Sequence, residues 1–506
     1  MDVNGENLRF IMGFKLKQYR LENGLSLKEL GEKTDLSISY LSEIEKGKKY
    51  PKPEKILQLA QALGVSFDEL VSLQVNKDLD PLPVIFSSPV IKEFPFRMFG
   101  VSPQDLLALI TGDPAKAGAF IRTLLEIGQD YDMRVEHLLL AALRSYQQMN
   151  QNYFGDIEDA AEGFLREMRW SPEPPLDSAL IANFLQEKFH YRFDEETLSG
   201  YPELEDARSV LVEGAAPRLL IRKDLQPEQK KFILAREIGY RHLNLKERSL
   251  SSAWMNVASF DQIVNDFKAS YFAGALLMNR ELLCRDLTQF LRRPRWDGAA
   301  LLEMIERYQV SPEMFLYRAS ELLPQFFGLK DFMFFRFSNG RGSHFIELAK
   351  LFNMSRISIP NGIGAREHYC RRWMAPKLLS ALKEQQQNGS YDGKPLIGVQ
   401  RSRFIDHGVE TFGITLARPS SVEKHANASG TISFVINEHF KKTVAFWNDP
   451  EIPVVEVNET CERCSLPAAI CHERAVPPGI YEKQQQANRQ EKVMRDLIER
   501  MAGEGK

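Results

Sequence analysis

The stretch SLKELGEKTDLSISYLSEIEKG, residues 26–47, holds two short helical patterns separated by a tight turn. Ser26 can cap the first helix, because its hydroxyl can accept a hydrogen bond from a backbone N–H of the first turn. Ser37 or Ser39 can begin the second helix, which Gly47 ends. Apolar residues recur at helical spacing on both sides of the turn. The stretch therefore predicts two helices that meet across a short turn, in the geometry of a helix-turn-helix.

Helical patterns on either side extend this motif into a small all-α domain over residues 8–73. One helix precedes the motif and two follow it, with apolar residues such as Leu16, Ile56 and Leu63 at core-facing positions. The segment resembles the Cro/repressor-type (XRE) DNA-binding domain over its whole length. The resemblance implies that the second helix of the motif enters the major groove of double-stranded DNA. A small helical bundle that contacts another protein is the alternative.

The predicted DNA contacts fall into two groups. In the helix-turn-helix docking mode, the first residues of the second helix face base edges, and nearby lysines lie close to phosphates. Candidates for base contact are Ser37, Ile38, Ser39, Tyr40 and Ser42, and candidates for phosphate contact are Lys28, Lys46, Lys48 and Lys49. Because a dimer doubles the phosphate contacts, we expect a homodimer on the operator DNA.

The bulk properties of the 506-residue chain limit its class. At about 100–200 residues per domain, the length predicts three or four domains. A hydrophobic content of 43% is typical of globular proteins, and a net charge of −3 excludes a generally basic nucleic-acid coat. The sequence shows neither a bilayer-spanning apolar run nor a signal-peptide pattern, so we expect a cytoplasmic protein without a membrane partner. In that compartment clustered cysteines favour metal binding over disulfides.

Beyond residue 73 the composition changes several times, and each change predicts a boundary. Proline-rich sequence predicts an extended linker over 74–101. Residues 102–175 are strongly helical, and this region serves either dimerisation or the core of one monomer. The remaining segments are a mainly helical domain (176–330), an α+β domain (331–480) and a polar, solvated tail (481–506). The predicted fold class is therefore multidomain, with an all-α N-terminal domain, a helical middle and an α+β C-terminal domain.

The segment KKFILAREIGYRHL predicts an amphipathic helix over about 226–245, and FKASYFAGALLMNRELL follows it. These pieces resemble the core of ImmA/IrrE-type zinc metallopeptidases of zincin-like fold, in which a His-Glu-x-x-His helix binds the metal and its glutamate activates water. Here Arg236 and Tyr240 stand at the histidine positions, and only Glu237 remains. His242 lies two residues too late to replace Tyr240. Since an arginine does not lose its proton to bind zinc, we expect a degenerate domain that is not an enzyme.

The C-terminal domain is rich in β-branched and aromatic runs that are separated by Gly, Asn and Pro. Such runs predict strands around an antiparallel sheet, so this domain is α+β. The predicted strands are FMFFRF, RISIP, LIGVQRSRF, GVETFGITLA, TISFVI and IPVVEV.

Four of the five cysteines lie in this last domain: Cys370 in HYCRRW, and Cys461, Cys464 and Cys471 in CERCSLPAAICHERAVPP. A C-x2-C pair followed, after six intervening residues, by a third thiol can surround one metal, and Cys370 can supply a fourth ligand. Four thiolates suit structural zinc or an iron–sulfur cluster, and chance clustering of reduced thiols is the alternative. Cys284, within an apolar helix, is predicted to be a core residue.

The order of these parts is specific. An XRE domain, a degenerate ImmA/IrrE-like domain, HYCRRW and the terminal CERC…CHERAVPP resemble the short-chain fatty acyl transcriptional regulators (ScfR family, RamB/PrpR-like) over nearly the whole chain. The resemblance implies a C-terminal domain that senses acyl-CoA and a 4Fe-4S cluster on Cys370, Cys461, Cys464 and Cys471. It also implies control of glyoxylate or methylcitrate pathway genes, and thus of acetate or propionate metabolism.

An acyl-CoA effector carries phosphates and an adenine, which basic side chains beside an aromatic surface can bind. Arg371, Arg372 and Trp373 offer this chemistry. Further candidates, which equally suit surface ion pairs, are Arg401, Arg403 and Arg418. Two other functions stay open: an ImmA/IrrE-like peptidase that cleaves a repressor, and a phage or toxin–antitoxin-type repressor that responds to a protein partner.

Overall fold

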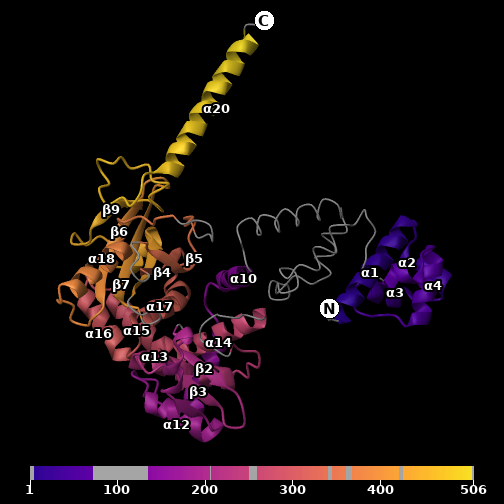
Figure 1. Cartoon of the computed structure of the whole chain (residues 1–506), viewed down its shortest axis with the longest axis horizontal. Helices are drawn as coiled ribbons and strands as arrows, with labels where there is room; N and C mark the ends of the chain where they lie inside the picture. Colours follow the sequence, from indigo (N-terminus) through magenta and orange to yellow (C-terminus); the bar gives the residue numbers. More distant parts are fainter. Residues whose placement is uncertain are drawn as a thin grey trace. The chain divides into compact units, whose positions relative to one another are not determined.

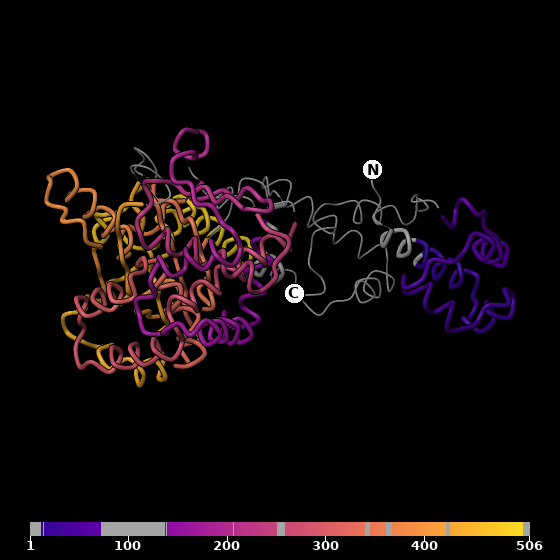
Figure 2. Tube along the Cα trace, turned by 90° about the horizontal axis from the view of Figure 1, so that it is seen from below, coloured from indigo at the N-terminus to yellow at the C-terminus, as the bar shows by residue number. Residues whose placement is uncertain are grey.

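The computed structural model describes residues 5–71, 135–205, 207–249, 259–339, 345–360, 367–420 and 426–503. The chain divides into two compact units, Met1–Ala142 and Leu143–Lys506 (Figures 1 and 2). The predicted linker, 74–101, and the first part of the predicted helical region, up to residue 134, lie outside the described residues. Within the described ranges, none of the helices has the length and apolar character that crossing a membrane requires.

Residues 5–71 of the first unit are all-α, as the sequence predicts. Its described part holds α1 (Gly5–Glu22), α2 (Leu27–Thr34), α3 (Ile38–Glu45), α4 (Pro53–Leu63) and α5 (Phe67–Val71). Buried residues from all five helices, among them Leu16, Leu30, Leu41, Leu59 and Leu70, share one core. The helices α2 and α3 form the helix-turn-helix.

Local side chains fix the turn between α2 and α3. Ser26 and Glu29 form a capping box, in which each side chain accepts a hydrogen bond from the other residue's backbone N–H. Asp35 ends α2 in the left-handed conformation, at φ 50°. A Cβ on Gly31 would lie 2.7 Å from the Leu36 carbonyl oxygen, so only glycine permits this close approach. Ser37 then caps α3 by accepting the backbone N–H of Tyr40 at 3.2 Å.

The boundary between the units falls within the helix over Val135–Met149, and the second unit continues with further helices and a small sheet. Its elements up to residue 327 are α10 (Val135–Met149), α11 (Gly155–Met168), α12 (Ser178–Phe189), β1 (Arg192–Asp194), η3 (Thr197–Gly200), η4 (Pro202–Leu204), β2 (Ser209–Val212), β3 (Arg218–Ile221), α13 (Pro227–His242), α14 (Phe260–Leu277), α15 (Arg280–Leu291), α16 (Gly298–Tyr308) and α17 (Pro312–Phe327). The mainly helical prediction for 176–330 missed the β1-β3-β2 sheet. Its strands of three or four residues are too short for a clear alternating pattern.

A six-stranded sheet, order β5-β4-β8-β7-β6-β9, forms the described C-terminal domain. The remaining elements are β4 (Phe332–Asn339), β5 (Glu347–Asn353), α18 (Met374–Gln387), β6 (Leu396–Phe404), β7 (Val409–Pro419), β8 (Asn427–Val435), α19 (Glu438–Thr443), β9 (Val454–Val457) and α20 (Gly479–Gly503). The antiparallel prediction is wrong for β9, which pairs with β6 in parallel. The segment RISIP is not a strand; the edge strand is β5, and a turn built on Asn353 and Ser355 follows it.

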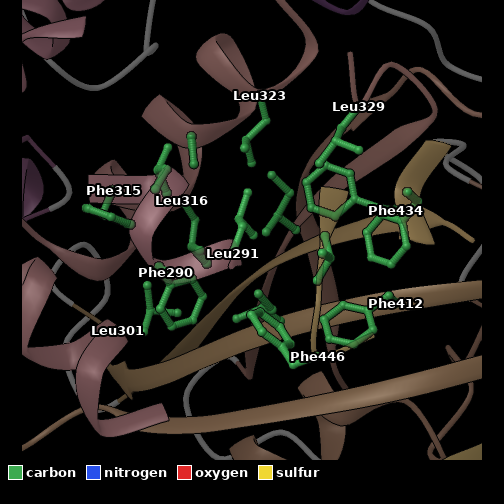
Figure 3. Close-up of a pocket in the computed structure, with 16 residues that line it drawn as sticks. Phe290, Leu291, Leu301, Phe315, Leu316, Leu323, Leu329, Phe412, Phe434 and Phe446 are labelled. Carbon is green, nitrogen blue, oxygen red and sulfur yellow. The ribbon is translucent and has the colours of Figure 1, made fainter. Parts of the chain in front are cut away.

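The sheet is covered on both faces. The helix α18 packs on one face and α17 on the other. Between α15, α17 and the sheet lies a cavity of about 40 Å³, lined only by apolar side chains such as Phe290, Leu316 and Phe412 (Figure 3). The α20 helix extends away from the sheet and is mostly exposed, which agrees with a solvated tail (Figure 1).

Candidate functional site

The predicted base-contacting residues lie together at the start of α3. Ser37, Ile38 and Ser39 are exposed, and Tyr40 and Ser42 are half-buried. Leu41 and Ile44, on the opposite side of the helix, are fully buried in the core. Ile38 keeps 50% of its surface exposed, which leaves an apolar side chain available for a thymine methyl group. The arrangement presents the N-terminal residues of α3 outward, as base contact requires.

The predicted phosphate contacts lie at the surface of the first unit. The four lysines Lys28, Lys46, Lys48 and Lys49 are all exposed. Lys49 forms an ion pair with Glu43 at 2.7 Å, so part of its charge is already balanced. Lys55, which the sequence analysis did not select, places its ammonium 4.5 Å from the centre of the Tyr40 ring. Because Lys55 belongs to α4, only the folded domain shows that it adjoins the recognition helix.

A buried ion pair fixes α3 against α1. Arg20 donates to both carboxylate oxygens of Glu45, at 2.6 and 3.1 Å, and to the Leu25 carbonyl at 2.8 Å. Both side chains are almost fully buried. Since the last residue of α3 is held in this way, the orientation of the recognition helix is set by the core.

In the IrrE-like region, the only residue kept from the metallopeptidase pattern is already paired. Glu237 is fully buried and accepts two hydrogen bonds from Arg248, at 2.8 and 2.7 Å, and one from the Tyr191 hydroxyl at 2.8 Å. Burial would raise the pKa of Glu237, but Arg248 and Arg236 hold it below its usual value. A carboxylate in this state is an ion-pair partner rather than a base poised to take a proton.

The two positions that would carry zinc ligands, Arg236 and Tyr240, have buried polar atoms. Among the described residues, Arg236 Nε, the Tyr240 hydroxyl and Asp266 Oδ1 are buried without a hydrogen-bond partner. Burial raises the pKa of Asp266 to about 6, against the attraction of Arg236. His242 is exposed at the end of α13, with its ring against Phe164. Neither Arg236 nor Tyr240 supplies the imidazole that a His-Glu-x-x-His site uses to bind zinc.

The cysteine segments meet through backbone pairing. Tyr369 and Thr460 form an antiparallel bridge, and Cys370 N–H donates to the Glu459 carbonyl at 3.1 Å. In return Cys461 N–H donates to the His368 carbonyl at 2.7 Å. Two segments that lie about ninety residues apart in sequence are therefore held side by side, as one shared centre would require.

Charged side chains reinforce this junction. Arg463 donates to both oxygens of Glu367, at 2.8 and 2.6 Å, and Thr460 donates to the same carboxylate at 2.7 Å. Glu462 accepts the backbone N–H of His368 and pairs with its ring. None of these contacts was predicted, because each joins residues whose proximity depends on the fold.

Cys370, Cys461, Cys464 and Cys471 are reduced and buried, in one region of the domain. Burial raises the pKa of Cys370 to about 11, and the neighbouring Cys461 and Cys464 add to the rise. Cys461 Sγ accepts the Ala475 N–H at 3.4 Å. Within the described ranges, no three His, Cys, Asp or Glu side chains are set together as a ready metal-binding group. The donor set itself, four soft thiols from two paired segments, fits iron or zinc. Cys284 is half-buried in α15, away from this set in sequence and element.

The predicted ligand residues beside Cys370 are not a surface patch. Trp373 is buried in the sheet core, with its ring 5.5 Å from that of Phe335. It also lines a cavity of about 30 Å³ under α18, together with Gln400, Thr411 and Thr431. Arg371 and Arg372 are half-buried, and burial lowers the pKa of Arg371.

The three further arginines differ in their surroundings. Arg401 pairs with Glu410 at 2.6 Å and lies over the Trp447 ring, and Arg403 is exposed. Arg418 pairs with Glu228 of α13 at 2.9 Å, which joins the sheet to the IrrE-like region. Of these three arginines, Arg418 is the one whose ion-pair partner, Glu228, lies outside the six-stranded sheet domain.

Two protein families match parts of the chain. Residues 16–70 match the helix-turn-helix family, and residues 190–320 match the family described as the IrrE N-terminal-like domain. A "Propionyl-CoA carboxylase regulator" from Cereibacter sphaeroides is 25% identical over 287 residues. That match covers 53% of this chain and 56% of the regulator, so the chain spans little more than half of that relative's length.

Two further comparisons cover different shares of the chain. The "HTH-type transcriptional regulator y4dJ" of Sinorhizobium fredii is 38% identical over 66 residues, which are 13% of this chain and 86% of that protein. A solved "Mycobacterium tuberculosis transcriptional regulator" is 15% identical and has a TM-score of 0.46, over 66% of this chain and 92% of the solved one. The chain belongs to the XRE-type helix-turn-helix transcriptional regulators, and it joins that domain to an IrrE-like domain, a combination consistent with the short-chain fatty acyl transcriptional regulators.

Proposed function

We propose that this DNA-binding regulator responds to a short-chain acyl-CoA and controls genes of acetate or propionate metabolism. The observation that carries the proposal is that one chain contains both parts of a regulator. It has an outward-facing α3 surface in its first unit and a second compact unit with a core of its own. The name of the Cereibacter sphaeroides relative, a propionyl-CoA carboxylase regulator, supports this effector class. A homodimer in the cytoplasm, bound to a two-fold operator, would supply the required phosphate contacts.

The cysteine set forms the second part of the proposal. Cys370, Cys461, Cys464 and Cys471 would hold a 4Fe-4S cluster, with structural zinc as the alternative metal. The cluster would supply a redox-sensitive link between the two paired segments. The support is the burial of all four thiols and the backbone pairing that brings Cys370 to Cys461.

We further propose that the IrrE-like region is a scaffold and not a peptidase. Support comes from Arg248, which occupies both oxygens of Glu237, and from Arg236 and Tyr240 at the positions of metal ligands. Chelator-sensitive cleavage of a repressor by the purified chain, lost in Glu237→Gln, would favour the peptidase alternative instead.

A selection experiment identifies the operator and tests the regulatory proposal on it. The full chain selects duplexes from a random pool, and fluorescence anisotropy then measures its affinity for the selected site. Acetyl-CoA, propionyl-CoA and unacylated coenzyme A are added in turn. We expect the acyl-CoA thioesters to change the affinity and coenzyme A to change it less. Equal affinity under all conditions would favour a repressor that responds to a protein partner.

A further inference from the structure

Basic side chains from adjacent strands gather on the α17 side of the six-stranded sheet. Arg336 of β4 stands directly opposite Lys350 of the edge strand β5. On the other side of β4, the β8 strand contributes small residues, with Gly430 opposite Arg336. The next strand, β7, carries Arg418 opposite Ala428 of β8. Because residues paired across strands share a face, these three cations line one face with little side chain between them.

A fourth cation joins them from the IrrE-like region. Arg208, just before β2, has its pKa lowered to about 10 by burial and by the positive charges of Arg336, Arg236 and Arg418, while Glu313 opposes the shift. Glu313, in the first turn of α17, touches the same group: its Cγ lies 3.5 Å from the place a Cβ would take on Gly430. The sheet, α17 and the IrrE-like region thus meet at this basic cluster, defined as Arg208, Arg336, Lys350 and Arg418.

The carboxylates beside the basic cluster pair unevenly with its cations. Glu228 pairs with Arg418 at 2.9 Å, and Glu313 reaches Arg336 only at 3.4 Å. Burial raises the pKa of a third neighbour, Glu321, to about 8, and this carboxyl accepts a hydrogen bond from Arg318 at 2.9 Å. Glu313 therefore interacts with Arg208, Arg336 and Arg418 at once. Like charges placed opposite one another across a sheet are destabilising, and a bound anion would offset this repulsion.

Hydrogen-bonding capacity remains in the same cluster. Among the described residues, Arg336 Nη2 and Arg418 Nε are buried without a hydrogen-bond partner. Lys350 has a solvent-exposed surface. The protein atoms that surround it nevertheless remove part of the water around its ammonium, and this desolvation lowers its pKa to about 8. Its ammonium lies 3.5 Å from the centre of the Tyr317 ring, which holds it over the α17 side of the sheet. Guanidinium forks and a nearby ammonium are the donors that phosphate oxygens prefer.

We propose that Lys350, Arg336 and Arg418 bind phosphate groups of the effector, at the junction of the sheet, α17 and the IrrE-like region. The inference rests on the proposed function, since coenzyme A thioesters carry several phosphates on a nucleotide. Binding there would neutralise like charges on three elements at once and so favour the arrangement in which those elements are packed together.

Calorimetric titration of the full chain tests the site with two probes, propionyl-CoA and inorganic pyrophosphate. Lys350→Gln removes one cation from an exposed position, so the fold is retained and melting should not fall. We expect this variant to weaken propionyl-CoA binding about tenfold, as loss of one charge-assisted hydrogen bond predicts. Lys350→Arg should restore most of the affinity. The matched control is Lys383→Gln, an exposed lysine of α18 on the opposite face of the sheet, which should change affinity less than about twofold.

The outcomes separate the site from the function. If wild type and Lys350→Gln bind propionyl-CoA equally, the phosphate site is overturned while the acyl-CoA proposal stands. If propionyl-CoA does not bind the wild type, the proposed function fails. In that case the phosphate site is supported only when pyrophosphate binds the wild type and Lys350→Gln weakens it, and it is overturned when pyrophosphate binds neither protein.

Discussion

Arg248 holds both carboxylate oxygens of Glu237, at 2.8 and 2.7 Å, in the interior of the IrrE-like region. The guanidinium also stacks on Tyr240, 3.9 Å from the ring centre. The residue that would activate water in a metallopeptidase is thus the anchor of a buried ion pair. This ion pair joins α13 to the segment that follows it.

The first prediction concerns this pair. Arg248→Met should lower the free energy of unfolding by about 3–5 kcal/mol, because it leaves a buried carboxylate without its partner. Glu237→Gln should cost less, since its amide oxygen can still accept from Arg248 and Tyr191. Chemical denaturation of the full chain measures both. Equal stability of Arg248→Met and wild type would show that the pair contributes nothing.

The second prediction concerns the pH dependence of stability. The pKa of Asp266 is about 6 in the folded chain and near 3.8 when unfolded, so the folded state binds the proton more tightly. The stability that protonated Asp266 contributes is therefore fully present below pH 3.8, and this contribution is lost as the pH rises through 6. The Asp266→Asn variant does not show this loss, because its side chain does not ionise. Its free energy of unfolding, relative to that of wild type, should be about 2 kcal/mol higher at pH 8 than at pH 4.

The control for this experiment is Asp261→Asn, an exposed carboxylate at the start of the same helix. It should show no such dependence on pH. The charged groups that face Asp266 are Arg236, which favours ionisation, and Glu237, which opposes it. A constant difference between Asp266→Asn and wild type from pH 4 to 8 would contradict the assigned shift.

The third prediction separates base contacts from phosphate contacts. Ser39→Ala should reduce discrimination between the selected duplex and random DNA, by about 1 kcal/mol or more, and leave random binding unchanged. Lys48→Ala should weaken both duplexes equally and lower the salt dependence of binding. Lys394→Ala, an exposed lysine of the second unit, serves as the control. If both variants bind like the control, α3 is not the recognition helix.

The fourth prediction concerns the thiols. Cys461→Ser should abolish bound iron and visible absorption in anaerobic preparations, because it removes one of four ligands. Limited proteolysis should then cut more readily beyond Pro453, where the paired segments lose their link. Cys284→Ser should change neither property. Preparations without iron or zinc, or identical behaviour of the two variants, would reject the cysteine centre.

Sequence patterns predicted those elements whose signals are local. The caps at Ser26 and Ser37, the turn at Asp35 and the strand-like run of residues 396–404 each determine structure within a few residues. The parallel partner of β6 could not be foreseen, since β9 joins it only after an intervening hairpin and helix. Arg248 and Lys350 were missed for the same reason: their importance lies in contacts with Glu237 and Arg336, and nothing beside them in the sequence indicates those contacts.

The central claim, that acyl-CoA and DNA binding are coupled, is tested most directly by measuring one ligand's affinity in the presence of the other. Propionyl-CoA is titrated into the full chain with and without a saturating amount of the selected duplex. Because coupling free energy is reciprocal, DNA must change the Kd of propionyl-CoA by the same factor by which propionyl-CoA changes the Kd of DNA, typically about 5–150-fold. We predict matching factors in the two titrations. A propionyl-CoA Kd that is the same with and without the duplex would contradict the account.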